Sequence, residues 1–229
     1  MMINTSEDLY DFLVKKDVTR LCHFTKTKNL VHILSSTEGI EATAFIKNDV
    51  KHQNDLGRYD GHLEYVCCSI EYPNSWYWEK LRIRDSNYIF KEWVILCIDL
   101  DIIKHKKIKF SPCNAALSNG KYIKGNLNDF PELYAQSLNY NKYRERTLKM
   151  LNCCPTDDQA EILVYSNIPL RYINKIIVGS EEIADHINAI LKTLKLDLEV
   201  FICADACNTE WSKMVRNGIR PEETKFTVG

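Results

Sequence analysis

The sequence predicts an α+β fold. Short runs of β-branched and aromatic residues, bounded by turn residues, lie among segments with helical periodicity. Their order lacks the regular strand–helix–strand alternation of a doubly wound sheet. The sequence also contains no GxGxxG and no GxxxxGKS/T motif, so neither a Rossmann nor a P-loop nucleotide site is supported.

Helical periodicity and capping residues predict five helices. The first has Thr5 or Ser6 as its N-cap, and the second ends before Gly39, a residue that commonly follows a helix. Isoleucine and leucine recur on one face of the longest helix, near the C-terminus. The predicted helices cover residues 6–16, 29–36, 74–81, 180–194 and 209–216.

Apolar runs between turn residues predict the strands. The polar segment 40–63 separates the first strand from the second and is expected to be a long loop, and such loops are usually functional or disordered. The predicted strands cover residues 21–25, 65–70, 93–99, 161–166, 173–178 and 198–203.

The composition is that of an ordinary globular protein, with 229 residues, 45% of them hydrophobic and 27% charged. No repeat or linker divides the chain, so we expect residues 1–229 to form a single domain. The longest apolar runs are far shorter than the roughly 18 residues of a membrane span. The first seven residues do not resemble a signal peptide, and we therefore expect a cytoplasmic protein that does not enter a membrane.

Glu161 stands at the start of an apolar strand. Strand alternation places Ile162 and Val164 on one face and Glu161 with Leu163 on the other. A carboxylate that is held on a rigid strand in a partly dry site can stabilise a developing positive charge. Glu161 could instead be a solvated carboxylate at the edge of a sheet, and the sequence alone does not decide between the two interpretations.

Four more polar residues are candidates for ligand binding. Arg58 lies in a glycine-flanked turn and could hold a pyrophosphate bidentately, or it could pair with Asp60 within the turn. His23 and Thr25 alternate onto one strand face, where a histidine is commonly a core residue. Asn29 follows one helical turn later and could contact a ligand or cap the helix.

Cations and aromatic residues are interleaved between residues 76 and 84. This combination suits a single nucleic-acid strand, through base stacking and phosphate neutralisation. A net charge of −1 argues against binding by bulk electrostatics, but a local patch is compatible with it. The segment could also be a solvated helix face with its tryptophans in the core. The candidates are Trp76, Tyr77, Trp78, Lys80, Arg82 and Arg84.

Other catalytic classes have little support. The sequence has no GxSxG motif, and no cysteine lies in a recognisable protease context. The nine cysteines lack zinc-site spacing, so we expect reduced thiols and no metal. Asp99 and Asp101 could be half of a metal-dependent nuclease site, although turns after strands often contain aspartate.

Several of these segments together resemble the DarT toxins. The resemblance runs from about Leu21 to Val178, and the Gln159-Ala160-Glu161 strand is its most specific part. Cys67-Cys68-Ser69 departs from the more aromatic version found in the family, and this departure bears on base specificity. The segments are His23-Phe24-Thr25, Asn29-Leu30, Ile33-Leu34, the loop with Arg58, Tyr65-Val66 with Ser69 and Pro73, Gln159 to Val164, Ile168-Pro169 and Ile173.

DarT toxins are ADP-ribosyltransferases that modify bases in single-stranded DNA and are encoded beside a macrodomain antitoxin. The resemblance implies an ADP-ribosyltransferase-like α+β fold, with central mixed or antiparallel sheets and flanking helices. It implies NAD as co-substrate without a metal, single-stranded DNA as substrate, a macrodomain antitoxin as partner and a place in a toxin–antitoxin or phage-defence system. It also implies that Glu161 is the catalytic glutamate, that Arg58 is the essential arginine, and that His23, Thr25 and Asn29 lie along the NAD pocket.

Three other functions are compatible with the sequence. The same chemistry could act on RNA, because an aromatic and cationic surface accepts either kind of single strand unless the 2′-hydroxyl is contacted. A catalytically silent nucleic-acid-binding module could keep the fold, although such a binder has no need for Glu161 beside a polyanion. A nuclease using Asp99 and Asp101 would be exposed by its sensitivity to EDTA.

Overall fold

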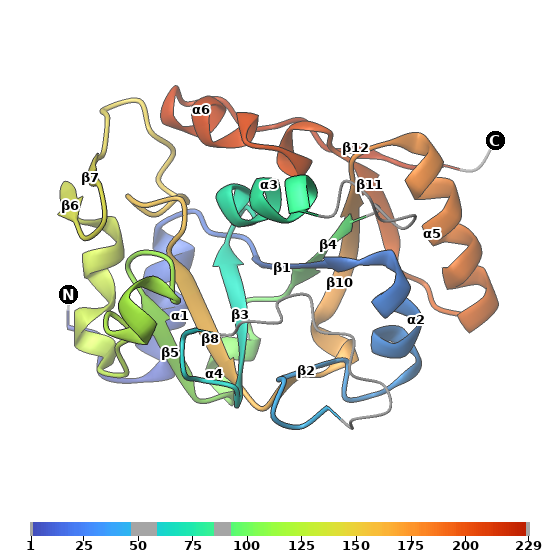
Figure 1. The fold of residues 1–229 in the computed structure, drawn as a ribbon, viewed down its shortest axis with the longest axis horizontal. Coiled ribbons are helices and arrows are strands. Elements are labelled where there is room, and N and C mark those ends of the chain that lie inside the picture. Colours follow the sequence, from blue (N-terminus) through green and yellow to red (C-terminus); the bar gives the residue numbers. More distant parts are fainter. Residues whose placement is uncertain (1, 47–58, 85–92, 228–229) are drawn as a thin grey trace.

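A mixed sheet flanked by helices forms the centre of the computed structural model, which describes residues 2–46, 59–84 and 93–227 without the side chains of residues 75 and 81–84 (Figure 1). In the described part of the chain, eight strands lie in the order β12-β11-β10-β4-β1-β3-β8-β5. Strands β10 and β11 pair in parallel, and the other neighbours pair antiparallel. This arrangement confirms the predicted α+β class.

The strands are short, and the central ones are apolar. All six residues of β4 are buried, as its continuous run Trp-Val-Ile-Leu-Cys-Ile requires of a strand that is covered on both faces. Two further strand pairs lie outside this sheet: β2 (Ile40–Glu41) with β9 (Asn167–Ile168), and β6 (Ser137–Asn139) with β7 (Tyr143–Glu145). The eight strands are β1 (Leu21–Lys26), β3 (Tyr65–Ile70), β4 (Trp93–Ile98), β5 (Ile108–Ser111), β8 (Glu161–Tyr165), β10 (Ile173–Val178), β11 (Glu199–Ile202) and β12 (Thr224–Lys225).

Capping side chains mark the start of α1 and of α5. Thr5 caps α1 in a reciprocal capping box with Asp8, and the Ser180 side chain caps α5. The α-helices are α1 (Ser6–Lys15), α2 (Thr27–Ser35), α3 (Ser75–Arg84), α4 (Ile102–His105), α5 (Glu181–Leu194) and α6 (Glu210–Arg216). Short 3-10 helices cover Leu117–Gly120 (η2), Leu127–Tyr134 (η3), Leu170–Tyr172 (η4) and Asp205–Cys207 (η5). None of the described helices is long and apolar enough to span a membrane.

The hydrophobic core joins residues from Ile3 to Val215 in one cluster. The alternation predicted for β8 is confirmed, because Ile162 and Val164 belong to this cluster while Leu163 packs with Tyr65 and Ala115 in a smaller one. Glu161 therefore lies on the side of the sheet that carries the smaller cluster.

Strands β5 and β2 are among the short elements that were not predicted. Strand β5 lies in a lysine-rich segment whose buried Ile108 and Phe110 alternate with Lys109, a pattern that is too brief to stand out from the surrounding charges. Strand β2 forms within the predicted loop 40–63, of which residues 47–58 lie outside the described part. It pairs with β9 because Gly39, at φ 67°, brings the chain so close that a Cβ there would collide with the carbonyl oxygen of Ile168.

Candidate functional site

The candidate site lies where β1 and β3 diverge. Strand β1 pairs with β4 along its whole length, from Leu21 to Lys26. It pairs with β3 through Leu21 and Cys22 alone, opposite Ile70 and Ser69. The first residues of β1 and the last residues of β3 therefore stay paired, while the rest of the two strands separate. A cavity lies between the separated parts.

The cavity has a volume of about 920 Å³. This is near the upper end of the roughly 300–1,000 Å³ that is typical of small-molecule sites. Strand β1 and helix α2 line one side, β3 and α3 another, and residues 39–46 and 114–119 close parts of the rim. His23, Thr25, Asn29 and Glu161, which the sequence analysis singled out, all line this one cavity.

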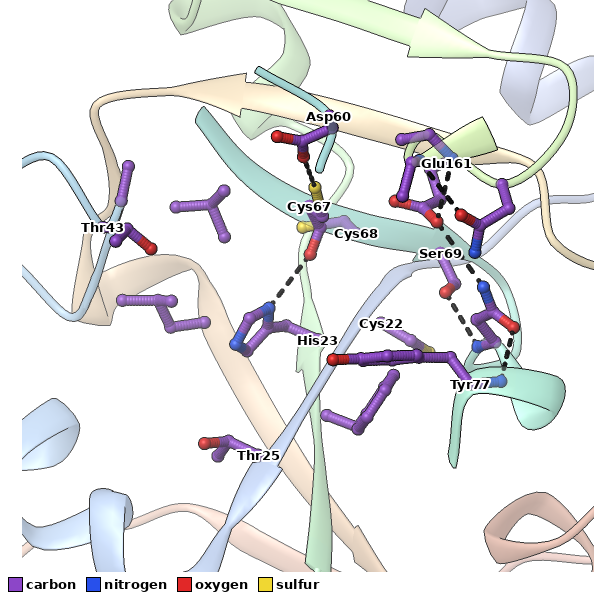
Figure 2. Close-up of a pocket in the computed structure, with 18 of the residues that line it drawn as sticks. Cys22, His23, Thr25, Thr43, Asp60, Cys67, Cys68, Ser69, Tyr77 and Glu161 are labelled. Carbon is purple, nitrogen blue, oxygen red and sulfur yellow. Dashed lines mark hydrogen bonds between the residues drawn. The ribbon is translucent and has the colours of Figure 1, made fainter. Parts of the chain in front are cut away.

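Glu161 is buried, with 9% of its surface exposed, so the structure excludes the alternative of a solvated edge carboxylate. As the first residue of β8 it lies between Ser69 of β3 and Ser111 of β5 in the strand register. Its Oε1 accepts long hydrogen bonds from the backbone N–H of Ala115 (3.4 Å) and from Nδ2 of Asn74 (3.5 Å). Figure 2 shows its carboxylate on the cavity wall beside Ser69.

Asn74 links this carboxylate to helix α3. Its Oδ1 accepts from the backbone N–H of Tyr77 (3.1 Å) in the manner of a helix N-cap, and its own N–H donates to Oγ of Ser69 (2.9 Å). The N-cap could be anticipated from the turn before α3. Its reach to Glu161 could not, because the two residues are 87 positions apart in the sequence.

The environment of Glu161 keeps a neighbouring thiol neutral. Burial, together with the negative charge of Glu161, raises the pKa of Cys68 well above its usual range. Burial likewise raises the pKa of Cys113 to about 12, against the smaller opposing effect of a hydrogen bond with Ser111. These thiols are poor nucleophiles, which leaves the carboxylate as the group suited to chemistry in this part of the cavity.

His23, Thr25 and Asn29 form the opposite wall. His23 Nδ1 lies 3.0 Å from the carbonyl oxygen of Cys67, so this nitrogen carries the proton and the bond bridges the diverging strands (Figure 2). Asn29 Nδ2 donates to Oγ1 of the buried Thr25 (3.1 Å). The structure thus brings these residues together across from Glu161, in the position that a ligand spanning the cavity would contact.

The aromatic and cationic segment divides between surface and core. Trp76 and Lys80 are exposed, one helical turn apart, and both line the cavity. Trp78 points the other way: it is 6% exposed and packs against Phe24 and Trp93, with ring centroids 5.3 and 5.8 Å apart. Trp78 is therefore a core residue, and its predicted role in a binding surface is wrong.

Three predicted site residues are not described by the structure. Arg58 lies outside the described residues, and so do the side chains of Arg82 and Arg84 in the last turn of α3. Asp101, the residue considered for a nuclease site, pairs instead with Lys104 and His105 of the following helix. Among the described residues, no three His, Cys, Asp or Glu side chains lie together in a group that could hold a metal ion.

A family model matches most of the chain. It is described as "DarT: ssDNA thymidine ADP-ribosyltransferase, DarT", and it covers residues 22–206. None of the curated proteins compared with the chain matches it.

Solved structures share the fold. Thermus sp. 2.9 DarT in complex with carba-NAD+ is 17% identical, with a TM-score of 0.59 over 83% of this chain and 98% of that chain. The same protein in complex with ADP-ribosylated ssDNA gives a TM-score of 0.58 at 17% identity, over 83% of this chain and 96% of that chain. Thermosipho africanus DarTG in complex with ADP-ribose is 18% identical, with a TM-score of 0.53 over 82% of this chain and 51% of that longer chain.

Proposed function

Because the chain belongs to the DarT family of ssDNA thymidine ADP-ribosyltransferases, we propose that it transfers ADP-ribose from NAD to a thymidine base in single-stranded DNA. The observation that supports this most directly is the placement of Glu161. It is buried at one wall of a large cavity, across from His23, Thr25 and Asn29. A fixed carboxylate facing a polar binding wall is the arrangement that cleavage of a glycosidic bond requires.

NAD fits this cavity chemically. The hydroxyl of Thr25 and the amide of Asn29 offer hydrogen bonds to its sugar and amide groups, and apolar residues such as Ile40 and Val66 offer surface to its rings. We assign the pyrophosphate to Arg58, whose guanidinium can bind two phosphate oxygens at once. No metal is needed, since the chemistry depends on a carboxylate and a good leaving group.

The position of Glu161 gives it two roles in the proposed transfer reaction. Nicotinamide leaves with the electrons of its bond to the ribose, and positive charge develops on the ribose. Glu161 holds a ribose hydroxyl and stabilises this charge from a site that excludes most water. A nitrogen of the base attacks the same ribose carbon, and Glu161 accepts the proton that the nitrogen loses.

A single strand is the favourable acceptor because its bases are already accessible. Extracting a base from a duplex costs a few kcal/mol. Trp76 offers an exposed aromatic face at the cavity rim, and Lys80, Arg82 and Arg84 supply positive charge along α3 for the phosphates.

The cellular setting follows from the family. We propose that the enzyme is the toxin of a toxin–antitoxin pair, with a macrodomain antitoxin as its partner. We place it in the cytoplasm, which suits nine cysteines that are all free, and we treat residues 1–229 as one domain, which suits a core that joins Ile3 to Val215.

The test is to incubate the protein with labelled NAD and, separately, single-stranded DNA, duplex DNA, RNA and a protein lysate, with and without EDTA. We expect label on single-stranded DNA alone, unaffected by EDTA. Glu161→Gln should lower transfer by at least about 100-fold while NAD still binds, because the neutral amide cannot stabilise a cation. Glu64→Gln is the matched control, since Glu64 directly precedes β3, far along that strand from Ser69, and does not line the cavity.

Each other result points to a different function. Label on RNA or protein would keep the chemistry and change the substrate. NAD binding without transfer to any acceptor would favour the silent module. Near-normal transfer by Glu161→Gln would remove the proposed role of Glu161.

A further inference from the structure

Helix α6 lies beyond the family match, which ends at residue 206, yet it contacts the segment that leads into Glu161. The backbone N–H of Leu151 donates to the carbonyl oxygen of Val215 (3.0 Å), and Nη2 of Arg216 donates to the carbonyl oxygen of Thr156 (3.0 Å). Thr147 Oγ1 donates in turn to the carbonyl oxygen of Arg216 (2.8 Å). These bonds hold residues 147–156 against α6, immediately before the strand that carries Glu161.

Asp158 is the point at which α6 and α3 meet. Its Oδ2 accepts hydrogen bonds from Oγ of Ser212 in α6 (2.6 Å) and from Nε1 of Trp76 in α3 (3.0 Å). Asp158 and Ser212 are both buried, at 9% and 8% exposed. Figure 1 shows α6 alongside α3, at the end of the sheet where β8 begins. Bonds between buried partners, one of them charged, are stronger than surface bonds and hold their groups in one orientation.

The hydrogen bond from Nε1 to Asp158 holds one edge of the Trp76 indole ring, while much of the side chain remains accessible. Trp76 is 48% exposed and lines the cavity that contains Glu161. Lys142, in the turn between β6 and β7, places its Nζ 5.9 Å from the centre of the Trp76 ring. An aromatic face with a cation beside it, at the rim of a cavity, is the combination that a base and its phosphate would contact.

We propose that Asp158 and Ser212 are positioning residues that hold Trp76 as a stacking surface for the DNA strand, so that helix α6 forms part of the acceptor site. The inference rests on the proposed function and deepens it. Ser212 does not line the cavity. The inference predicts that a substitution at Ser212 raises KM for DNA and leaves KM for NAD unchanged. A purely structural role of α6 would affect both substrates together.

The experiment compares Ser212→Ala, Trp76→Phe and Trp76→Ala with the parent, using a thymidine-containing oligonucleotide. Three quantities are measured: KM for DNA, KM for NAD, and the rate of NAD hydrolysis without DNA, where water replaces the base. Loss of stacking in Trp76→Ala should weaken DNA binding roughly 5- to 100-fold. Ser212→Ala and Trp76→Phe, which each remove one hydrogen bond to Asp158, should raise KM for DNA about 2- to 10-fold.

Two internal comparisons make the test specific. Lys213→Ala is the matched control on α6, because Lys213 is exposed and pairs with Glu210 on the same helix. It should leave all three quantities unchanged. The double variant Ser212→Ala with Trp76→Phe should have less than the product of the two single effects, because both changes act through Asp158.

The inference is overturned if KM for DNA is unchanged in Ser212→Ala and Trp76→Phe, or if the two effects multiply. It is also overturned if NAD hydrolysis falls in parallel, because Ser212 would then act on Glu161 or on the fold, which a melting temperature would show. These results leave the proposed function intact as long as the parent protein modifies the oligonucleotide. Failure of the parent protein itself to bind or modify single-stranded DNA would overturn both.

Discussion

Asp157 and Glu161 lie four residues apart in neighbouring but different environments. Glu161 faces the cavity, whereas Asp157 is buried beside Asp158 and accepts a hydrogen bond from the backbone N–H of Gln159 (2.9 Å). The pKa of Asp157 is raised to about 6, chiefly by burial and also by the charge of Asp158, against the opposing effects of the hydrogen bond from Gln159 and the charge of Arg144. The turn before β8 therefore carries a carboxyl group with a pKa of about 6.

Asp157 should make the stability of the protein depend on pH. Its pKa is higher in the folded protein than its ordinary value of 3.8, so the folded state binds more protons between about pH 4 and pH 6. The free energy of unfolding contributed by Asp157 therefore falls as the pH rises through this window. Asp157→Asn should gain stability relative to the parent between pH 4 and pH 7, by up to about 3 kcal/mol. Urea denaturation at a series of pH values measures this difference.

Asp185→Asn is the control for this titration, because Asp185 is exposed on α5. Its stability should follow that of the parent at every pH. Parallel curves for Asp157→Asn and the parent would show that the pKa of Asp157 is close to its ordinary value.

At the scale of elements, ion pairs attach the C-terminal segment to the sheet. Arg20, just before β1, pairs with Glu223 (2.6 Å), and Lys175 of β10 pairs with the same carboxylate (2.7 Å). Glu71, directly after β3, accepts from the N–H of Thr19 (2.7 Å) and pairs with Arg220 (3.2 Å). The segment thus joins the start of β1, where β1 and β3 still pair, and it stabilises the end of the sheet from which the cavity opens.

Removing Glu223 should be costly. Glu223→Ala leaves the Arg20 guanidinium, 5% exposed, without this partner, and we expect a loss of about 3 kcal/mol in the free energy of unfolding. Glu199→Ala is the matched control: it breaks the Glu199–Lys225 pair between β11 and β12, whose side chains are both more than half exposed, and should cost under about 1 kcal/mol. Chemical denaturation compares the two, and equal losses would contradict a special role for the Arg20 pair.

At the scale of the whole molecule, positive charge is balanced by negative charge, 30 residues against 31. The lysine-rich segment 104–109 does not act as one patch: Lys104 pairs with Asp101, Lys106 donates to Asn167, and Lys109 lies over the ring of Tyr65. The cations that the sequence analysis proposed for a nucleic-acid strand, Lys80, Arg82 and Arg84, belong instead to α3, where Lys80 lines the cavity.

Replacing Lys80, Arg82 and Arg84 together by alanine should weaken binding of single-stranded DNA and reduce its dependence on salt. Each phosphate contact that is lost should lower the slope of log K against log salt by about 0.7. Fluorescence anisotropy at several salt concentrations measures this slope. An unchanged slope would place the phosphate contacts elsewhere, while NAD hydrolysis serves as the control for an intact NAD pocket.

The sequence by itself determined the fold class, most of the long elements and the family. All six predicted strands agree with the observed ones to within one residue at each end. Periodicity and caps suffice there because they are local properties of the chain. The Gln159-Ala160-Glu161 strand also identified the family that the model over residues 22–206 confirms. The roles of Glu161, Arg58, His23, Thr25 and Asn29 stay predictions.

The tertiary structure decided what local patterns leave open. In the folded protein Glu161 and Trp78 are buried, whereas Trp76 is exposed at the rim of the cavity. Burial depends on which elements pack against a residue and not on its neighbours in sequence. The tertiary structure also joined residues such as Trp76, Asp158 and Ser212, which lie more than 50 positions apart. Such contacts arise when β1 and β3 diverge and distant segments fill the space around the opening, and no periodicity in the sequence encodes them.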